Sequence, residues 1–587
     1  MAESGDPEKV SRDEDSKEPV ERHDHAASKE SLPADQTSSR SSDSSSIGRA
    51  SEDSIALEPL DHTISPALQE VIQIQTATSV GSSISRPPEF EVDFGDDDNP
   101  REWSFWFRAW MTFAISYSTW IVVLYSTTYT SSIPGLKEEF NVTDQTIATL
   151  GVTTYLIGLG TGSLVWAPVS ELYGRKPVYL VCMTVFTLLI LPACLATSLT
   201  EILVVRFFGA LFGAALIVNS AGTVVDISTE ETRALVLSLW SIAPLNGPVT
   251  GPVIGGFVFQ YLGWRWDNWL ILILAGVGSL CMLGTKETYG PVILKAKAAR
   301  IRKETNDDRW WTRYDLNLSP IDIVKVNLTR PFVLFFTEPI LWFFNLWISI
   351  VYGILYLCFV AYPIVFTQHR GWSPGLTGLS FVGIGIGTTI GIAGEPIWRR
   401  IVNAHPLDPV TGRRPPEATA RILAIGSILT PIGQLVFAQT SLPPIHWAVS
   451  IAFGIPFGLG NAFTFIYGSN YLAGAYGIYA ASALAGNAVT RSLLGGLLPL
   501  AGPKLYAALT PRWAGTFLGL LEVVLIPIPF VFWRYGDKIR AKSPAIRALR
   551  EDQERIERRA ARAQRRKERM HQKSAVGATV EPTKEDV

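Results

Sequence analysis

Ionisable side chains inside long apolar segments are the first candidates for chemistry in this sequence. Arg491 lies near the middle of the apolar segment 479–509, and Glu522 lies near the middle of the next one, 512–533. On neighbouring antiparallel helices both would lie at a similar depth in a membrane, where an unpaired charge is costly. This favours a mutual ion pair. A carboxylate at that depth could also exchange a proton, so a static pair and a proton-coupling site both stay open.

A third charge of this kind is Arg206, a short distance inside the outer end of the apolar segment 202–225. Glu201, at that end, is its candidate partner. Charged residues within membrane-spanning helices are rare and usually functional. Arg206 therefore joins Arg491 and Glu522 as a candidate site residue.

Hydrogen-bonding and aromatic residues form a stripe in the apolar segment 338–362. Its members recur at spacings of four, three and four residues, so on a helix they share one face: Asn345, Ser349, Tyr352 and Tyr356. Aromatic walls with few charges suit an amphipathic or apolar organic molecule. We expect this face to bind substrate, with Asn461 and Trp120 as weaker candidates. Packing against another helix would explain each residue equally well.

Glycine and proline alternate in a stretch within the uncharged segment 235–261. Gly247, Gly251 and Gly255 recur every four residues and would form a strip without side chains, which another backbone can approach closely. Each proline removes a helical hydrogen bond, which a lipid-embedded helix tolerates only when other groups satisfy the freed carbonyl. We interpret the stretch as a joint between moving parts, although a seam that only holds a bundle together is the alternative. Its other members are Pro248, Pro252 and Gly256.

The composition indicates a membrane protein. The chain has 587 residues, of which 47% are hydrophobic and only 18% charged, although its two ends are polar. The four cysteines lack metal-type spacing, so we expect neither a metal site nor a disulfide framework. No Walker A motif occurs, and ATP is therefore not expected to be the direct source of energy. We expect no cofactor, no catalytic residue and no nucleic-acid partner.

Apolar stretches of roughly 20 residues, the length that crosses a bilayer core, follow one another along the chain. Six precede a polar gap and six follow it, at approximately 107–128, 145–168, 178–197, 202–225, 235–260, 267–286, 338–362, 375–396, 419–439, 445–468, 479–509 and 512–533. This predicts an all-α membrane protein of two pseudo-symmetric six-helix bundles. The bundles would comprise residues 101–287 and 331–535, joined by a central loop, 288–330.

The predicted tails are polar. Residues 1–100 are rich in Ser, Asp and Glu, so we expect disorder there, and whether this tail is phosphorylated stays open. Residues 536–587 are basic and charged, and residues 540–573 are readable as an exposed helix. Loops rich in Lys and Arg remain in the cytoplasm, which predicts that both termini and the central loop are cytoplasmic.

Small residues at four-residue spacing recur in every third predicted helix. They occur in the second, fifth, eighth and eleventh, and the pattern suggests repeated units of three helices, as in alternating-access carriers. Outside the stretch described above they are Gly158, Gly162, Gly383, Gly387, Gly391, Ser482 and Gly486.

Three motifs, in this order, resemble the major facilitator superfamily and, within it, the fungal drug:proton antiporter group with twelve spans. The loop 167–176 is similar to the loop between spans two and three of the family, although it has Ala167 and Leu172 where the family usually has Gly and Arg. The segment 206–213 resembles the arginine motif of span four, and the Gly-Pro stretch resembles the antiporter motif of span five.

The resemblance implies roles for several of these residues. It implies a latch between the two halves on the cytoplasmic side, in which an acid approaches the amino end of the eleventh helix near Tyr479. It also implies a place in a proton path for Arg206. Charges that only fix the topology are the alternative to a latch, whose candidate members are Glu171, Gly174, Arg175, Lys176 and Asp226.

These observations predict a proton-coupled exporter of small organic compounds, such as drugs, toxins or secondary metabolites. Its partners would be the substrate, protons and the bilayer, and we expect a monomer in the plasma membrane, with the vacuolar membrane as an alternative. A proton-coupled uptake carrier and a polyamine exporter are alternatives, although Val360 stands where polyamine-exporting relatives tend to have an acid. A transport-inactive sensor is the alternative from another class.

Overall fold

The computed structural model describes residues 88–95, 98–229, 232–312, 314–315, 320–407 and 414–547, together with 551 and 558. Most of the predicted disordered tail, and most of the charged helix predicted for residues 540–573, lie outside the described residues.

The first half contains six spans, each close to a predicted apolar stretch. Asp144 caps the second span, because its side chain accepts a hydrogen bond from the Thr146 N–H, and Ser198 caps the fourth in the same way. The helices are α2 (Phe105–Glu139), α3 (Gln145–Tyr173), α4 (Arg175–Leu195), α5 (Leu199–Val218) continued by α6 (Ser220–Ile227), α7 (Arg233–Leu262) and α8 (Trp264–Leu283).

In the second half several spans are interrupted. A π-helical turn, η3 (Ile364–His369), extends the seventh span, and the eighth and tenth each consist of two helices. The elements are α11 (Pro339–Pro363), α12 (Pro374–Leu379), α13 (Val382–Ala393), α15 (Glu417–Thr440), α16 (Trp447–Ala452), α17 (Gly454–Tyr476), α18 (Ala480–Leu525) and α19 (Pro527–Lys542).

The last two spans lie in one long helical stretch. Eleven helical stretches among the described residues are long and apolar enough to cross a membrane, and the last, Ala480–Lys542, has 63 residues. At 1.5 Å per residue it would be about 95 Å long, about three times a bilayer core. Thr510 breaks it, because its φ of 62° and ψ of 156° are not helical, and Pro511 follows. The stretch therefore supplies spans eleven and twelve, and the predicted all-α twelve-span fold is confirmed.

Corresponding helices of the two halves pack in the same way. The glycine strip of α3 lies against α5, where a Cβ on Gly158 or Gly162 would overlap a backbone carbonyl. The strip of α13 lies against the two helices of the tenth span, where Gly383 and Gly387 meet carbonyls in the same manner. Likewise α7 packs on α2 and α18 on α11. This agrees with the repeat predicted from the small residues.

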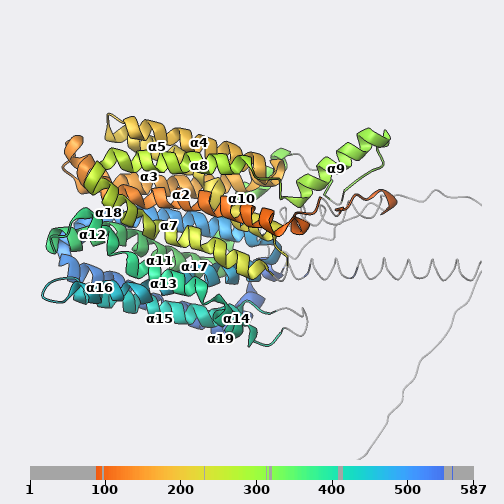
Figure 1. Cartoon of the computed structure of the whole chain (residues 1–587). Coiled ribbons are helices and arrows are strands. Elements are labelled where there is room, and N and C mark those ends of the chain that lie inside the picture. The colour runs from red at the N-terminus through yellow and green to blue at the C-terminus, as the bar shows by residue number, and fades with distance from the viewer. Residues whose placement is uncertain are drawn as a thin grey trace, which may run out of the picture. The chain divides into compact units, whose positions relative to one another are not determined.

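Shorter helices mark the two ends of the spans. At one end, which we call the basic side, lie α9 (Gly290–Thr305), α10 (Pro320–Thr337) and α14 (Glu395–Asn403), whereas α12 and α16 lie at the other end, the opposite side (Figure 1). The remaining short turns are η1 (Pro88–Phe90), η2 (Pro100–Glu102) and η4 (Gly477–Tyr479).

The segment before the first span packs on the connection between the halves. Val92 N–H donates to the Trp311 carbonyl at 2.8 Å, and the Lys297 ammonium lies 2.8 Å from the Asp98 carboxylate. The packed part of the chain therefore begins before residue 101, earlier than predicted.

Candidate functional site

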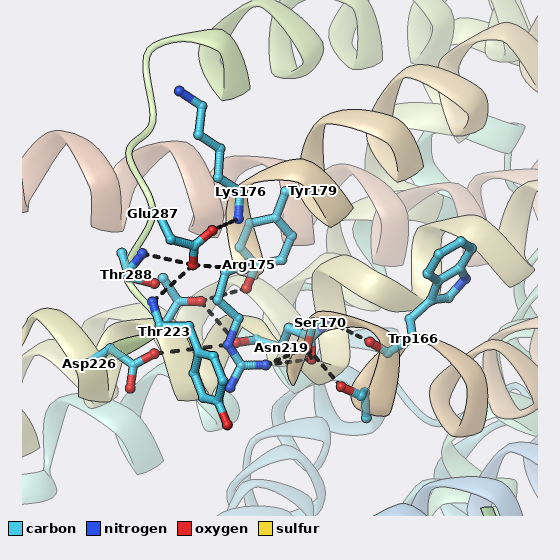
Figure 2. Close-up of polar contacts among 12 residues, drawn as sticks. Trp166, Ser170, Arg175, Lys176, Tyr179, Asn219, Thr223, Asp226, Glu287 and Thr288 are labelled. Atoms are coloured by element: carbon cyan, nitrogen blue, oxygen red, sulfur yellow. Dashed lines mark hydrogen bonds and ion pairs between the residues drawn. The ribbon is translucent and has the colours of Figure 1, made fainter. Parts of the chain in front are cut away.

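A polar cluster on the basic side surrounds the Arg175 guanidinium, at the start of α4 (Figure 2). Its Nη1 donates to Ser170 Oγ at 2.7 Å and to Asn219 Oδ1 at 2.9 Å. Its Nε lies 3.9 Å from Asp226 Oδ2, and its Cζ lies 5.0 Å from the centre of the Tyr289 ring. The cluster thus joins α3, α4 and α6 with Asn219, which stands between α5 and α6, and it brings Arg175 and Asp226, two of the predicted latch residues, close together.

The turn between α3 and α4 is held by Glu287, which follows α8. Gly174 has a φ of 100°, which L side chains rarely adopt, and a Cβ there would overlap the Glu287 carboxylate. The Lys176 side chain points away from the cluster, although its backbone belongs to it (Figure 2). The carboxylate accepts four backbone hydrogen bonds of 2.8 to 3.1 Å, from the N–H groups of Arg175, Lys176, Thr288 and Tyr289.

Glu171 connects the cluster to the segment that leads into the second half. It accepts a hydrogen bond of 3.5 Å from Asn327 Nδ2 on α10. One turn further along α10, the Arg330 guanidinium lies 5.4 Å from the centre of the Tyr479 ring, at the start of α18. The helix α10 therefore places side chains beside Glu171 and Tyr479, two residues of the predicted latch region, and this was not predicted from the sequence.

We predict that Glu287→Gln destabilises the protein. Glutamine keeps the size of the side chain but loses its charge and presents an amide N–H₂ to donors. Hydrogen bonds to a charged group contribute about 1.5–3 kcal/mol each, and the carboxylate also favours the positive end of the α4 dipole. Thermal unfolding in detergent should show a lower Tm. Glu304→Gln, on the exposed face of α9, is the matched control, and an equal Tm for the two variants would contradict the assignment.

The glycine strip of α7 faces α2, within the first half. Added Cβ atoms on Gly247, Gly251 and Gly255 would lie 3.0 to 3.1 Å from atoms of Val123 and Thr128. Prolines within α7 also remove helical hydrogen bonds, as predicted. Thr127 Oγ1 donates to the Pro248 carbonyl at 2.8 Å, and this is the carbonyl that Pro252 leaves without its helical donor. The neighbouring helix thus satisfies the defect.

Another face of α7 meets the second half. An added Cβ on Gly256 would lie 2.5 Å from the Pro374 carbonyl oxygen. The Gly375 N–H donates to Gln260 Oε1 at 3.0 Å, and Asn246 Nδ2 donates to Thr389 Oγ1 at 3.2 Å. The helix with the glycine-proline pattern is therefore packed both inside its own bundle and across the boundary between bundles.

The Arg206 side chain is enclosed by backbone carbonyls and tyrosine rings. It is 1% exposed, and it donates to the carbonyls of Gly151, Tyr125 and Ser126 at 2.8 to 3.3 Å. The prediction that Glu201 pairs with Arg206 is wrong, because the Glu201 carboxylate accepts a hydrogen bond of 2.8 Å from the Thr197 N–H at the end of the helix. The rings around the guanidinium, with centres 4.4 to 4.8 Å from Cζ, are Tyr125, Tyr129 and Tyr155.

The predicted ion pair between Arg491 and Glu522 is wrong. The Arg491 guanidinium lies over the rings of Phe465 and Tyr352, at 4.6 and 5.4 Å. Glu522 is 2% exposed, and among the described residues neither carboxylate oxygen has a hydrogen-bond partner. Similar depth in two neighbouring helices does not fix which face each side chain occupies. Their role in proton coupling stays a prediction.

The polar stripe of α11 packs against other helices. Asn487 Nδ2 on α18 donates to Asn345 Oδ1 at 2.8 Å, and the hydroxyls of Tyr356 and Ser126 lie 3.0 Å apart, across the two halves. Ser349 is buried, and the Tyr352 ring is 4.8 Å from that of Tyr356. These contacts fit the packing interpretation in this conformation, and substrate binding by the stripe stays a prediction.

The two weaker candidates also make contacts with protein. Trp120 Nε1 on α2 donates to Thr250 Oγ1 on α7 at 3.0 Å. Asn461 Nδ2 on α17 donates to the carbonyl of Phe457, one turn earlier, at 3.0 Å.

A cavity of about 330 Å³ opens between the halves on the opposite side. Its walls come from α2, the first residue of α3, α7, α11, η3, α12 and the residue before α13, and they are mostly apolar. Val360 is part of the wall, and among the described residues that line the cavity Lys137 is the one charged side chain. The others are Thr130, Ser131, Ile133, Pro134, Gln145, Pro252, Phe259, Phe359, Pro363, Thr367, Gln368, Pro374, Thr377, Gly378 and Phe381.

Residues 110–488 match the sequence profile of the Major Facilitator Superfamily. The chain belongs to this superfamily. It is therefore a multi-pass membrane transporter and not an enzyme, and the predicted family is confirmed. Relatives of this major facilitator protein come from fungi. An ascochitine biosynthesis cluster MFS transporter of Didymella fabae is 36% identical over 458 residues, covering 76% of this chain and 87% of the relative.

Two further relatives have names that refer to efflux or drugs. An MFS-type efflux pump of Trichophyton rubrum is 38% identical, covering 76% of this chain and 75% of the relative. The major facilitator superfamily multidrug transporter mdrA of Aspergillus fumigatus is 36% identical, covering 79% of this chain and 76% of the relative. These matches support the predicted fungal drug-efflux type of the family.

Solved structures share the fold. The proton:xylose symporter XylE, bound to 6-bromo-6-deoxy-D-glucose, matches with a TM-score of 0.54 and 13% identity, covering 74% of this chain and 96% of that one. The human organic anion transporter MFSD10 matches with a TM-score of 0.51 and 14% identity, covering 72% and 99%.

Two carboxylates of this major facilitator protein were not predicted as site residues from the sequence. Glu287 follows the sixth span, and two of its four backbone donors belong to α4, more than a hundred residues earlier. Asp267 lies in the first turn of α8. An acid at that position is sufficiently explained by the helix dipole. In both cases the one sequence feature that could have indicated the residue was an acid at the boundary of a span. Such acids are common in membrane proteins, so this feature is not specific.

Proposed function

We propose that this chain is a proton-coupled exporter of small organic compounds that works by alternating access between its two bundles. The observation that carries the proposal is the cavity of about 330 Å³ between the halves, a volume in the range of small-molecule sites. The seam between α7 and α12 borders it through Pro252 and Pro374. Relatives that are named efflux pump or multidrug transporter support the direction of transport.

The lining of the cavity favours neutral or weakly charged aromatic compounds. Phe259, Phe359 and Phe381 offer rings, and the threonines and glutamines offer hydrogen bonds. A polyamine would need carboxylates, whereas Lys137 contributes a positive charge and Val360 no charge. A biosynthetic product of the cell, as in the name of the Didymella fabae relative, fits this chemistry.

Protons are the proposed source of energy. The sequence lacks a nucleotide-binding motif, and the buried ionisable residues Arg206, Arg491 and Glu522 are the candidates for coupling. The basic loops favour a cytoplasmic position for the basic side and both termini. We assign the protein to the plasma membrane, with the vacuolar membrane as the alternative.

Transport by purified protein in liposomes tests the proposal. The panel would contain rhodamine 6G, fluorescein and several aromatic antifungal compounds, and the vesicles would have an acidic interior. Antiport predicts accumulation of at least one compound inside, whereas a proton-coupled uptake carrier would deplete it. A requirement for ATP, or no movement of any panel compound under the pH gradient, would contradict the proposal.

The same assay separates a transporter from a sensor. A chain that lacks residues 1–85 should transport as fast as the full chain, since the spans and the cavity begin later. Cells in which the full chain elicits a signal, without measurable flux, would favour the sensor.

We predict that Glu522→Gln lowers transport driven by a pH gradient about tenfold while the fold is kept, because glutamine is similar in shape to a protonated glutamate but cannot exchange a proton. Initial rates at a fixed gradient measure the effect. Glu395→Gln, whose carboxylate pairs with Arg399 at the basic side, is the control. Transport by Glu522→Gln at the wild-type rate would remove Glu522 from the coupling candidates.

A further inference from the structure

A buried carboxylate near the outer end of α8 has no part in the contacts described so far. Asp267 is 4% exposed, and its Oδ2 accepts a hydrogen bond from the Ser132 hydroxyl of α2. Its Oδ1 is also buried and has no hydrogen-bond partner among the described residues. A carboxylate in this state is costly unless it binds a proton or a water molecule.

A small cavity connects this carboxylate with the surroundings of Arg206. Its volume is about 10 Å³, close to the space that one water molecule needs. It is lined by Tyr125, Thr128, Tyr129, Ser132, Asp267 and Asn268, among others. The same two tyrosine rings flank the Arg206 guanidinium at 4.6 and 4.4 Å, and Arg206 Nη1 is buried without a partner in the described part of the chain.

The tyrosines between the two charges are held in place. Tyr125 Oη donates to Asn268 Oδ1 at 2.8 Å, and Tyr129 Oη donates to the Ala148 carbonyl at 2.7 Å. A negative carboxylate and a positive guanidinium therefore face each other across two fixed rings and a space for one water. Opposite charges attract each other in a poorly polarisable interior, so the two rings and the cavity link the charge of Asp267 to Arg206.

The same turns of α2 contact the joint of the transporter. Thr128 lines the small cavity, and its backbone N and O lie 3.0 and 3.1 Å from Cβ atoms added to Gly251 and Gly255 on α7. Ser126 lies two residues earlier on α2, and its hydroxyl is 3.0 Å from the Tyr356 hydroxyl of the second half. A displacement of α2 at this level therefore reaches both the glycine seam and the boundary between bundles.

We propose that Asp267 is a proton-binding residue of the transport cycle. It acts on Arg206 across the small cavity and, through α2, on the glycine strip of α7. This inference rests on the proposed proton coupling. The carboxylate forms an O–H bond with a proton from hydronium, which becomes water, and later returns the proton to water. The neutral acid no longer attracts Arg206, and α2 is freed to shift. The titratable groups that line the cavity with it are Tyr125 and Tyr129 on α2, and Arg206 on α5 and Cys194 on α4 lie near Tyr125.

Asp267→Asn tests the proposal in liposomes. The variant keeps the shape and the hydrogen bond with Ser132 but cannot release a proton. For the panel compound that the wild type moves fastest, acceleration by a pH gradient should fall at least about tenfold, while exchange of labelled for unlabelled compound without a gradient stays within about twofold. The matched control is Asp144→Asn at the same end of the first half, where asparagine caps α3 as well as aspartate does. An undiminished response of Asp267→Asn to the gradient would overturn the proposal.

A second measurement does not depend on transport or on the folding of a variant. Dicyclohexylcarbodiimide reacts with protonated carboxyl groups in apolar surroundings, and peptide mass spectrometry locates the adduct. When the full wild-type chain is treated at pH values from about 5 to 9, Asp267 should be labelled, and more strongly at the lower pH values. Absence of labelling across that range would overturn the proposal. If the wild type responds to no pH gradient, the proposed function fails, while the labelling still reports on Asp267.

Discussion

Gly251→Leu is expected to abolish transport. A Cβ at this position would overlap the Thr127 hydroxyl and lie 3.0 Å from the Thr128 N atom. Both belong to α2, whose backbone cannot move without opening the contact with α7. Overpacking of this kind costs about 1–3 kcal/mol or more. In addition, the Pro248 carbonyl of α7 would lose the hydrogen bond that Thr127 donates to it. We expect initial rates in liposomes at least about tenfold below wild type.

Gly276→Leu is the control for this prediction. It lies on α8 and no atom is found within 4 Å of an added Cβ, so a leucine there projects into free space or lipid. Transport should stay within about twofold of wild type. Equal transport rates for Gly251→Leu and Gly276→Leu would contradict the prediction. They would mean that close packing of the glycine strip against α2 is not needed for transport.

Arg206→Lys is the second prediction with a large effect. Lysine keeps the charge, but its single ammonium cannot reach the carbonyls of Gly151, Tyr125 and Ser126 with the geometry of a planar guanidinium. Hydrogen bonds to charged groups contribute about 1.5–3 kcal/mol each, and the stacking among three tyrosine rings is weakened as well. We expect a lower Tm and at least about a tenfold loss of transport.

The control for Arg206→Lys is Arg265→Lys. Arg265 lies at the start of α8, on the opposite side, and pairs with Glu139 at 2.7 Å, with both side chains more than a third exposed. An exposed pair of this kind contributes about 0–1 kcal/mol, so this variant should transport normally. A normal Tm and rate for Arg206→Lys would show that charge alone, and not the guanidinium geometry, is what this site requires.

The glycine-proline stretch was the best-predicted part of the site. Spacing along a helix follows from sequence, so Gly247, Gly251 and Gly255 had to share a face, and a proline had to free a carbonyl. That Thr127 satisfies this carbonyl, and that Gly256 meets α12 in the other half, could not be predicted. Those partners lie more than a hundred residues away along the chain.

For the charged residues within the spans, the sequence predicted the position along the helix but not the contacts. Depth along a span is readable from sequence, and Arg206, Arg491 and Glu522 are indeed within helices of the bundles. Their partners were predicted wrongly, because rotation of each helix about its axis decides which neighbour a side chain meets. Arg206 is surrounded by tyrosine rings and does not pair with Glu201. Arg491 lies over the rings of Phe465 and Tyr352 and does not pair with Glu522.

By itself the sequence determined the class of this protein. Apolar segments long enough to cross a bilayer, basic loops and three ordered motifs were sufficient for twelve spans, two bundles and a major facilitator transporter, because these properties are local and add along the chain. Only the tertiary structure decided which carboxylate stands near which cation. Glu287 at the α4 turn and Asp267 beside the tyrosines around Arg206 are brought there by helix packing, and packing depends on contacts between residues far apart in sequence.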